Sequence, residues 1–155
     1  MNIRKATQAD IPQILRLLVQ VNLVHHNGRP DIFKGPVTKY DEQQLRSLLT
    51  DERRPVYVCV EGARVLGYVF CILRETPDSP MMVETRTLYV DDLCVDEDAR
   101  GKGVGKALME DVTKLAKTLG CRSVTLNVWA CNEGARRFYE AIGMKEQRRT
   151  MELLL

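Results

Sequence analysis

The sequence predicts a single α/β domain that spans residues 1–155. Strand-like and helix-like runs alternate along the chain in the order βααβββαβαβ, with no repeat, linker or low-complexity tract. A glycine-rich turn stands between one of these strands and the helix that follows it. With 45% hydrophobic and 28% charged residues, a chain of this length can bury enough surface to fold without disulfides or a structural metal.

The first third of the chain predicts one strand and two helices. Residues 2–6 form the strand, and Thr7 can cap a helix whose apolar residues recur at helical spacing. Residues 25–39 contain two glycines and two prolines and keep no hydrophobic period, so we expect a loop there. Loops of this length often carry function. A short helix is expected over residues 41–50.

A β-hairpin dominates the middle of the chain. Residues 56–60 and 65–73 are rich in β-branched and aromatic side chains, and the turn-forming residues 61–64 join them. After a break that contains proline, over residues 76–82, a long strand is expected over residues 84–95. The two hairpin strands are therefore predicted to be antiparallel.

The last third alternates helices and strands. Residues 100–106 lead into a long amphipathic helix that Gly120 can close. Residues 121–129 alternate apolar and polar side chains and predict a strand. A short helix is expected over residues 132–141, and residues 145–154 are expected to form a final strand.

Charge, hydropathy and cysteine usage limit the kinds of partner. The net charge of +2 is too small to imply nucleic-acid binding, and no apolar run reaches the length of about 18 to 20 residues that a membrane span needs. The first residues lack the apolar stretch of a signal peptide, so we expect a cytoplasmic protein with no nucleic-acid or membrane partner. No cysteine pair has metal-ligand spacing, and we expect free thiols and no metal site. The cysteines are Cys59, Cys71, Cys94, Cys121 and Cys131.

The glycine-rich turn predicts an anion site. Residues 100–106 read Arg-Gly-Lys-Gly-Val-Gly-Lys, which brings free backbone N–H groups, a helix N-terminus and three cations to one place. A P-loop needs one more residue before its Gly-Lys pair and a Ser or Thr after it, and the third glycine of the dinucleotide fingerprint is missing. On glycine spacing alone, an ordinary turn is an equal alternative.

The surrounding residues add a family resemblance. The motif Arg100-x-x-Gly103-x-Gly105, with Leu93-Cys94-Val95 before it and Asn132 and Phe138-Tyr139-Glu140 after it, resembles the GNAT N-acetyltransferases. The element order fits that family over the whole chain, and residues 84–144 carry the specific motifs. The resemblance implies a mixed, mostly antiparallel sheet of six to seven strands, about four flanking helices, and a splay between the fourth and fifth strands.

The resemblance also implies acetyl-CoA as cosubstrate and a role for each matching residue. In the family, the glycine loop wraps the pyrophosphate with backbone amides, and the end of the fourth strand pairs with the pantetheine arm as an added strand would. The family tyrosine protonates the CoA sulfur. The implied cofactor-binding residues are Leu93, Cys94, Val95, Arg100, Gly101, Lys102, Gly103, Val104, Gly105, Lys106, Asn132 and Tyr139.

Acetyl transfer to an amine needs a base, an oxyanion donor and an acid for the departing thiolate. The resemblance assigns the acid to Tyr139, and packing beside Phe138 in the core is the alternative. Asn132 can touch the CoA arm, cap a helix, or do both. The backbone N–H of Leu93 or Cys94 is the expected oxyanion donor.

Asp91 is the best candidate for the base, with Glu84 and water as the alternatives. The segment Leu-Tyr-Val-Asp-Asp at residues 88–92 resembles a strand of diamine acetyltransferases, in which an acidic residue at the place of Asp91 attracts and deprotonates the amine. Those enzymes usually carry Glu there, and a solvated strand position is the alternative. Because neighbouring strand residues point to opposite faces, Asp91 and Asp92 can both face a cleft only if a bulge intervenes. The family carries such a bulge.

Further residues are expected to contact the acceptor. His25, His26, Asp91, Asp92 and Trp129 are the candidates, with solvated histidines and a core-packed tryptophan as alternatives. We expect acetyl transfer to a small cationic amine. The alternatives are acetylation of peptide or protein N-termini, as in ribosomal-protein acetyltransferases, and a non-catalytic CoA-binding regulatory domain.

The sequence also predicts a homodimer. A final strand that ends in three leucines, Leu153 to Leu155, would expose apolar side chains at a sheet edge in a monomer.

Overall fold

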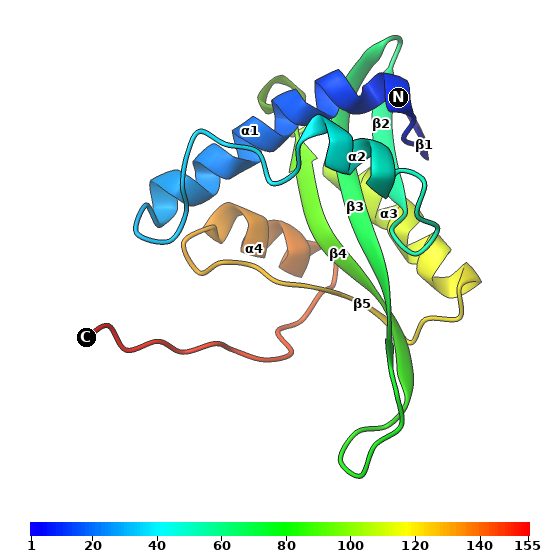
Figure 1. Cartoon of the computed structure of the whole chain (residues 1–155), viewed down its shortest axis with the longest axis vertical. Coiled ribbons are helices and arrows are strands. Elements are labelled where there is room, and N and C mark those ends of the chain that lie inside the picture. The colour runs from blue at the N-terminus through cyan, green and yellow to red at the C-terminus, as the bar shows by residue number, and fades with distance from the viewer.

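Five strands form one mixed sheet in the order β1-β2-β3-β4-β5 in the computed structural model, which describes all 155 residues (Figure 1). The four strands β1 to β4 pair antiparallel, and β5 pairs parallel with β4. The strands are β1 (Asn2–Lys5), β2 (Val56–Glu61), β3 (Arg64–Thr76), β4 (Thr85–Val95) and β5 (Ser123–Leu126). The predicted hairpin and its turn are confirmed.

Four α-helices cover the sheet: α1 (Ile11–Gly28), α2 (Glu42–Leu48), α3 (Val104–Thr118) and α4 (Glu133–Ala141). Side chains of α1 and α2 pack with Val58, Tyr68 and Phe70 in one core cluster. Side chains of α3 pack with those of the opposite face of the sheet in a second cluster, which α4 joins through Phe138. The sheet therefore lies between two helical layers.

The helix starts follow from local sequence. The Asp41 side chain accepts a hydrogen bond from the Gln44 N–H at 2.8 Å, and the Gln44 side chain accepts one from the Asp41 N–H at 2.9 Å, which is a capping box. At α4, the Asn132 side chain accepts from the Ala135 N–H at 3.2 Å, as the sequence predicts. Both caps join residues only three positions apart and therefore depend on local sequence alone.

A β-bulge interrupts the pairing of β3 with β4. Phe70 faces Asp92 and Cys71 faces Val90, so that Asp91 has no partner on β3. The extra residue shifts the alternation of side chains along β4 by one position. The bulge that the family resemblance implies is present, and it lies between the two aspartates.

The strands β4 and β5 separate just beyond this point. Their pairing ends at Val90 and Leu126, whereas β4 continues to Val95. One edge of residues 91–95 is therefore open. The opening between the two strands agrees with the splay that the resemblance implies.

The sheet has five strands, so the prediction of six to seven strands is wrong. Residues 145–154 form no strand: they pair with no part of the sheet and are almost entirely exposed. In Figure 1 this segment runs away from the sheet toward the C-terminus. A strand needs a paired partner as well as β-forming residues, and residues 145–154 do not pair with the free edge of β5. The predicted strand over residues 121–129 is also shorter, because pairing ends at Leu126.

The prediction of a loop from residue 25 is wrong at its start. Helix α1 continues to Gly28 and holds His25 and His26 in its last turn. No residue before Gly28 breaks a helix, and histidines near a helix C-terminus interact favourably with the helix dipole. The irregular segment between α1 and α2 comprises residues 29–41 and is called the strap below.

Candidate active site

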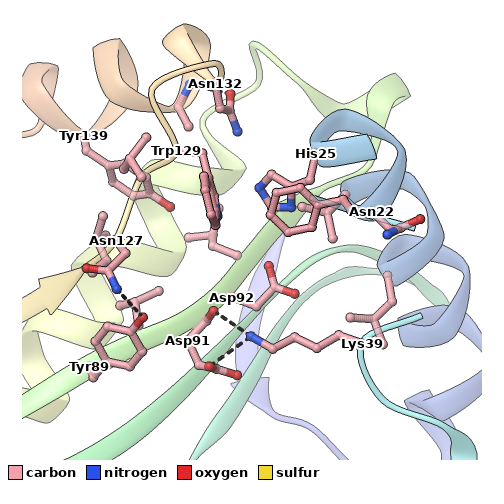
Figure 2. Close-up of a pocket in the computed structure, with 18 of the residues that line it drawn as sticks. Asn22, His25, Lys39, Tyr89, Asp91, Asp92, Asn127, Trp129, Asn132 and Tyr139 are labelled. Atoms are coloured by element: carbon pink, nitrogen blue, oxygen red, sulfur yellow. Dashed lines mark hydrogen bonds and ion pairs between the residues drawn. The ribbon is translucent and has the colours of Figure 1, made fainter. Parts of the chain in front are cut away.

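A cavity of about 430 Å³ opens where β4 and β5 separate (Figure 2). Its walls come from α1, the strap, β4, the segment that follows β5, and α4. Most of the lining is apolar, with Asp91, Asp92, Lys39, His25 and Tyr139 as the groups that can carry or exchange protons. A largely apolar cavity with a few convergent polar groups is the usual form of a small-molecule site.

The glycine loop lies between β4 and α3 and presents unpaired backbone donors. None of the N–H groups of residues 101–106 donates a hydrogen bond within the protein. Gly101 and Gly103 have φ values of +76° and +82°, a conformation that side chains with a Cβ rarely adopt. Successive free N–H groups at a helix N-terminus bind phosphate well. The geometry therefore favours the anion site over an ordinary turn.

The open edge of β4 presents backbone groups toward the cavity. The Asp96 N–H donates to the Leu66 carbonyl at 2.8 Å. In an antiparallel pair every second residue bonds to the partner strand, so the backbone of Cys94 also bonds to β3. The peptide groups of Leu93 and Val95 consequently face away from β3. The Arg100 Nε–H donates to the Val95 carbonyl at 3.4 Å from this open side.

Two neighbouring residues of α4 have different surroundings: Phe138 packs in the core and Tyr139 lines the cavity. The Phe138 ring packs close to Gly105 of α3, whereas Tyr139 lines the cavity. Burial, and then the charge of Asp92, raise the pKa of Tyr139 well above its ordinary value. The phenol is therefore protonated over the whole working pH range and can donate a proton.

Asp91 is held by the strap and its neighbours. Lys39 Nζ donates to Asp91 Oδ1 at 3.0 Å and to the Asp91 carbonyl at 3.3 Å (Figure 2). The Tyr40 hydroxyl donates to Asp91 Oδ2 at 2.6 Å, and Arg54 donates to the Tyr40 oxygen at 2.9 Å. Burial, followed by Asp91, raises the pKa of Tyr40 to about 12, so this phenol stays protonated. Both carboxylate oxygens of Asp91 are thus engaged.

Asp92 has fewer partners. The hydroxyl of the buried Tyr68 donates to Asp92 Oδ2 at 3.1 Å, and no protein group donates a hydrogen bond to Oδ1. Burial is the largest influence and raises the pKa of Asp92 to about 6, with a further rise from the charge of Asp91. Lys39, the Tyr68 hydroxyl and the Leu93 amide act in the opposite direction.

Of the other predicted site residues, His25 and Trp129 line the cavity, whereas His26 and Glu84 do not. His25 stacks on Phe33 at a ring-centroid distance of 5.0 Å, and Trp129 meets the same ring edge-on at 4.9 Å. Burial lowers the pKa of His25. His26 turns away from the cavity, with its Nδ1 at 2.7 Å from the Phe33 carbonyl. Glu84 is exposed at the protruding β3–β4 hairpin and is not among the lining residues.

Several residues that hold the two aspartates carry no signal in the sequence. Lys39 and Tyr40 lie in the irregular strap and reach Asp91 only through the fold. Tyr68 belongs to a β-rich run, where an aromatic residue indicates only a strand.

The structure contains no group of three or more His, Cys, Asp or Glu that could hold a metal ion. No helix is long and apolar enough to cross a membrane.

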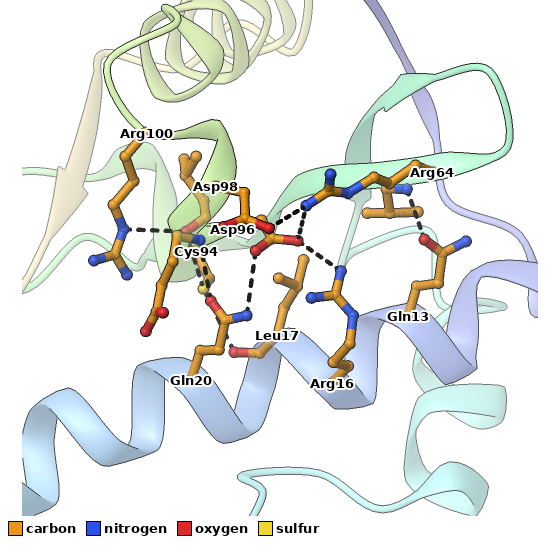
Figure 3. A network of polar contacts seen from close by, with 12 residues as sticks. Gln13, Arg16, Leu17, Gln20, Arg64, Cys94, Asp96, Asp98 and Arg100 are labelled. Carbon is orange, nitrogen blue, oxygen red and sulfur yellow. Dashed lines mark hydrogen bonds and ion pairs between the residues drawn. The ribbon is translucent and has the colours of Figure 1, made fainter.

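A second polar network fixes the strand end from which the glycine loop begins (Figure 3). The Asp96 side chain, 3% exposed, accepts from Arg16 of α1 and Arg64 of β3 at 2.8 and 2.9 Å, and from Gln20 at 3.3 Å. The Cys94 thiol adds a contact to the Leu17 carbonyl at 3.4 Å. Together these contacts join α1 to the end of β4.

The charge of Asp96 depends on its arginine partners. Burial alone would raise its pKa, but the hydrogen bonds from Arg16, Arg64 and Gln20 outweigh burial and hold the pKa of Asp96 far below its usual range. A carboxyl whose pKa is lower in the folded state stabilises the fold above the pKa of the unfolded chain, near 4, and this contribution is lost as the pH falls.

Comparison with known proteins identifies the family. The model of the acetyltransferase (GNAT) family matches residues 23–144, which is more than half of the chain. The chain therefore belongs to the GNAT acetyltransferase family, and the resemblance predicted from the sequence is confirmed. Acetyl-CoA is the cosubstrate that membership of this family implies.

Individual relatives differ in how much of their length the chain spans. An uncharacterized N-acetyltransferase of Methanocaldococcus jannaschii, MJ1207, is 27% identical over 94% of this chain, which spans 61% of that protein. The thialysine N-epsilon-acetyltransferase of Bos taurus is 27% identical over 93% of this chain and 84% of its own length. A crystal structure of a mutant BH1408 protein from Bacillus halodurans superposes with a TM-score of 0.96 at 34% identity, covering 100% of this chain and 99% of that one.

Gly103→Val should abolish acetyl-CoA binding in isothermal titration. A Cβ at Gly103 has free space around it, so the new side chain would stand where a phosphate approaches the backbone. The matched control is Gly120→Val, because Gly120 has a similar φ of +69° and equally free space but lies at the far end of α3. Gly120→Val should lower the stability of the fold without lowering the affinity for acetyl-CoA. Unchanged affinity in Gly103→Val would contradict the anion site.

Asp96→Asn should lower the free energy of unfolding by about 2 kcal/mol at neutral pH, because charge-assisted hydrogen bonds from two arginines become neutral. Asp98→Asn is the control. Asp98 also contacts Arg64, at 3.3 Å, but its side chain is 79% exposed. Asp98→Asn should therefore lower the free energy of unfolding by less than about 0.5 kcal/mol. In urea titrations, the difference between the wild type and Asp96→Asn should shrink below about pH 4. A pH-independent difference would contradict the proposed origin of the stabilisation.

Proposed function

We propose that the protein transfers the acetyl group of acetyl-CoA to the primary amine of a small cationic molecule. The observation that carries this proposal is the grouping at one cavity of an open strand edge, a protonated tyrosine and two adjacent carboxylates. Membership of the GNAT family supports the same reaction class. The thialysine acetyltransferase relative supports an amine acceptor.

The residues around the loop fit acetyl-CoA. The N–H groups of residues 101–106 and the side chains of Arg100, Lys102 and Lys106 bind the pyrophosphate in this proposal. The outward peptide groups of Leu93 and Val95 pair with the pantetheine amides along the open edge. Acetyl-CoA supplies the activated thioester. Asn132, which caps α4 and lines the cavity, contacts the same arm.

Two groups of the chain act on the thioester end in this proposal. The Leu93 N–H stabilises the negative charge that develops on the carbonyl oxygen. Tyr139 donates its proton to the departing sulfur. The Tyr139 phenol lines the cavity and is protonated at neutral pH, as an acid requires. This arrangement favours an enzyme over a regulatory domain that only binds CoA.

The walls of the cavity favour a small cationic acceptor. Asp91 and Asp92 supply negative charge, and the stacked rings of His25 and Phe33, with Trp129 edge-on against Phe33, form an aromatic wall. Aromatic faces and carboxylates together suit an organic ammonium group. The strap limits the volume to about 430 Å³, which suits a small molecule better than a peptide or protein N-terminus.

We further propose that the protein is a homodimer in the cytoplasm. The free edge of β5 and the exposed apolar residues of the C-terminal segment, Met151 and Leu153 to Leu155, offer surfaces that a second copy can cover. All five cysteines are free thiols, as a reducing compartment favours. Light scattering should give twice the mass of the chain, and a monomer at high concentration would contradict the dimer.

A panel of acceptors tests the function. Polyamines, small diamines, thialysine, amino sugars, amino acids and short peptides should be incubated with acetyl-CoA while CoA release and acceptor mass are followed. We expect acetylation of small amines that carry a second positive charge. A preference for peptides would favour the N-terminal alternative, and acetyl-CoA binding without any transfer would favour the regulatory one.

Tyr139→Phe should lower turnover by about 100-fold, because the acid is lost while the ring remains. The dissociation constant of acetyl-CoA should change little in the same variant. Tyr89→Phe is a matched control, since Tyr89 also lines the cavity and its hydroxyl meets only Asn127 in the structure, at 3.2 Å. Nearly unchanged turnover in Tyr139→Phe would show that the phenol is structural.

A further inference from the structure

We propose that Asp92 is the proton acceptor for the amine and that Asp91 is a positioning residue that fastens the strap over the cavity. This inference rests on the proposed function and deepens it. It differs from the expectation drawn from the sequence, in which the family resemblance gives the role of base to Asp91.

Each carboxylate oxygen of Asp91 already accepts a hydrogen bond from the strap. Lys39 and Tyr40, both from the strap, occupy its two oxygens at 3.0 and 2.6 Å. Arg54 holds the Tyr40 oxygen in turn. An amine that approaches Asp91 therefore meets a carboxylate that the strap already holds on both oxygens, whereas Asp92 has an oxygen with no such partner.

Asp92 has the free oxygen that a base needs. Its Oδ2 accepts from Tyr68, whereas Oδ1 receives no hydrogen bond from the protein. In Figure 2 the carboxylate lies between Asp91 and the wall formed by His25 and Trp129. An ammonium group that enters the cavity can therefore meet Oδ1 directly.

The groups that face Asp92 come from every surrounding element. Lys39 of the strap and the Tyr68 hydroxyl of β3 favour its charged form, whereas Asp91 and burial disfavour it. Tyr139 of α4 and Cys94 of β4 are neutral groups that sense its charge, and His25 of α1 lines the same cavity. The balance holds the pKa of Asp92 at about 6, close enough to neutral pH for a base to take up and release a proton.

The proton steps balance. The ammonium gives one proton to Asp92, and the neutral amine attacks the thioester carbon to form the C–N bond. As the C–S bond breaks, Tyr139 gives its proton to the sulfur and then takes the second proton from the amide nitrogen. Asp92 releases its proton to solvent. The products are the acetylated amine, CoA with a free thiol, and one proton.

The charge of Asp92 couples the protonation of Asp92 to the acidity of Tyr139. The negative charge of Asp92 raises the pKa of Tyr139, so the phenol becomes a stronger acid once Asp92 has taken the amine's proton. The base step therefore prepares the acid step.

The pH dependence of kcat/KM tests this assignment, with 1,3-diaminopropane as a strongly basic probe and 2,2,2-trifluoroethylamine as a weakly basic one. For the diamine, kcat/KM of the wild type should increase with pH up to a midpoint at about pH 6 and then level off, because Asp92 must be deprotonated to act as the base. In Asp92→Asn this midpoint should disappear and activity should climb with the free-amine fraction. At pH 7 the loss should be about 100-fold for the diamine and below about tenfold for trifluoroethylamine, which is mostly neutral and need not lose a proton before it attacks.

Two further variants shift the midpoint in opposite directions. Asp91→Asn removes a negative neighbour and should move the midpoint to lower pH, while loss of the strap's anchor raises KM. Lys39→Met removes a positive neighbour and should move the midpoint to higher pH. Asp92→Glu should retain a midpoint that Asp92→Asn lacks. These readouts stand even if Asp92→Asn folds poorly, which acetyl-CoA affinity and thermal melting would reveal.

Three results would overturn the assignment. A wild-type midpoint that persists in Asp92→Asn would place the base elsewhere, and equal losses for both amines would make Asp92 structural. Midpoints that do not move in Asp91→Asn and Lys39→Met would show that another group titrates. A wild-type protein that binds acetyl-CoA but acetylates no amine is a distinct result, because it would overturn the proposed function and this role with it.

Discussion

The bulge at Asp91 is the constraint on which the rest of the site depends. Up to Val90, strand β4 is paired on both sides, and one unpaired residue later it keeps only β3 as a neighbour. The extra residue brings both aspartates to one cavity and leaves the peptide groups of Leu93 and Val95 facing an open edge. The cavity, the acidic pair and the strand edge for a cosubstrate are thus consequences of one irregularity. An uninterrupted ladder would separate the two carboxylates onto opposite faces.

Two networks hold this irregular strand in place from its two sides. Beyond the bulge, Asp96 ties the strand end to α1 and β3 through two arginines, so the glycine loop starts from a fixed point. At the bulge, the strap binds Asp91 through Lys39 and Tyr40. The contrast between Asp91, with both oxygens engaged, and Asp92, with one oxygen free, follows from this arrangement. Adjacent groups of the same chemistry thus have different partners, and burial raises the pKa of Asp92.

Features that depend on neighbours in sequence could be predicted. The caps at Asn132 and Gly120, the hairpin turn and the glycine loop all act within a few residues, and the structure contains each of them. Features that depend on distant partners could not. The segment over residues 145–154 has a strand-like sequence but does not pair with the free edge of β5, and Lys39 and Tyr68 reach the acidic pair only through the fold. The histidines were predicted in a loop because the irregular composition begins beside them, whereas the helix continues to Gly28.

Hydrogen exchange of the backbone amides, measured with and without acetyl-CoA, tests the central claim that the bulge opens a strand edge for the cosubstrate. The amides of Leu93 and Val95 face no strand, and those of residues 101–106 have no acceptor, so all of them should exchange quickly in the free protein. Saturating acetyl-CoA should slow these amides strongly while the amides between β1 and β2 stay as they were. Acetyl-CoA that binds without protecting Leu93, Val95 and the glycine loop would contradict the account.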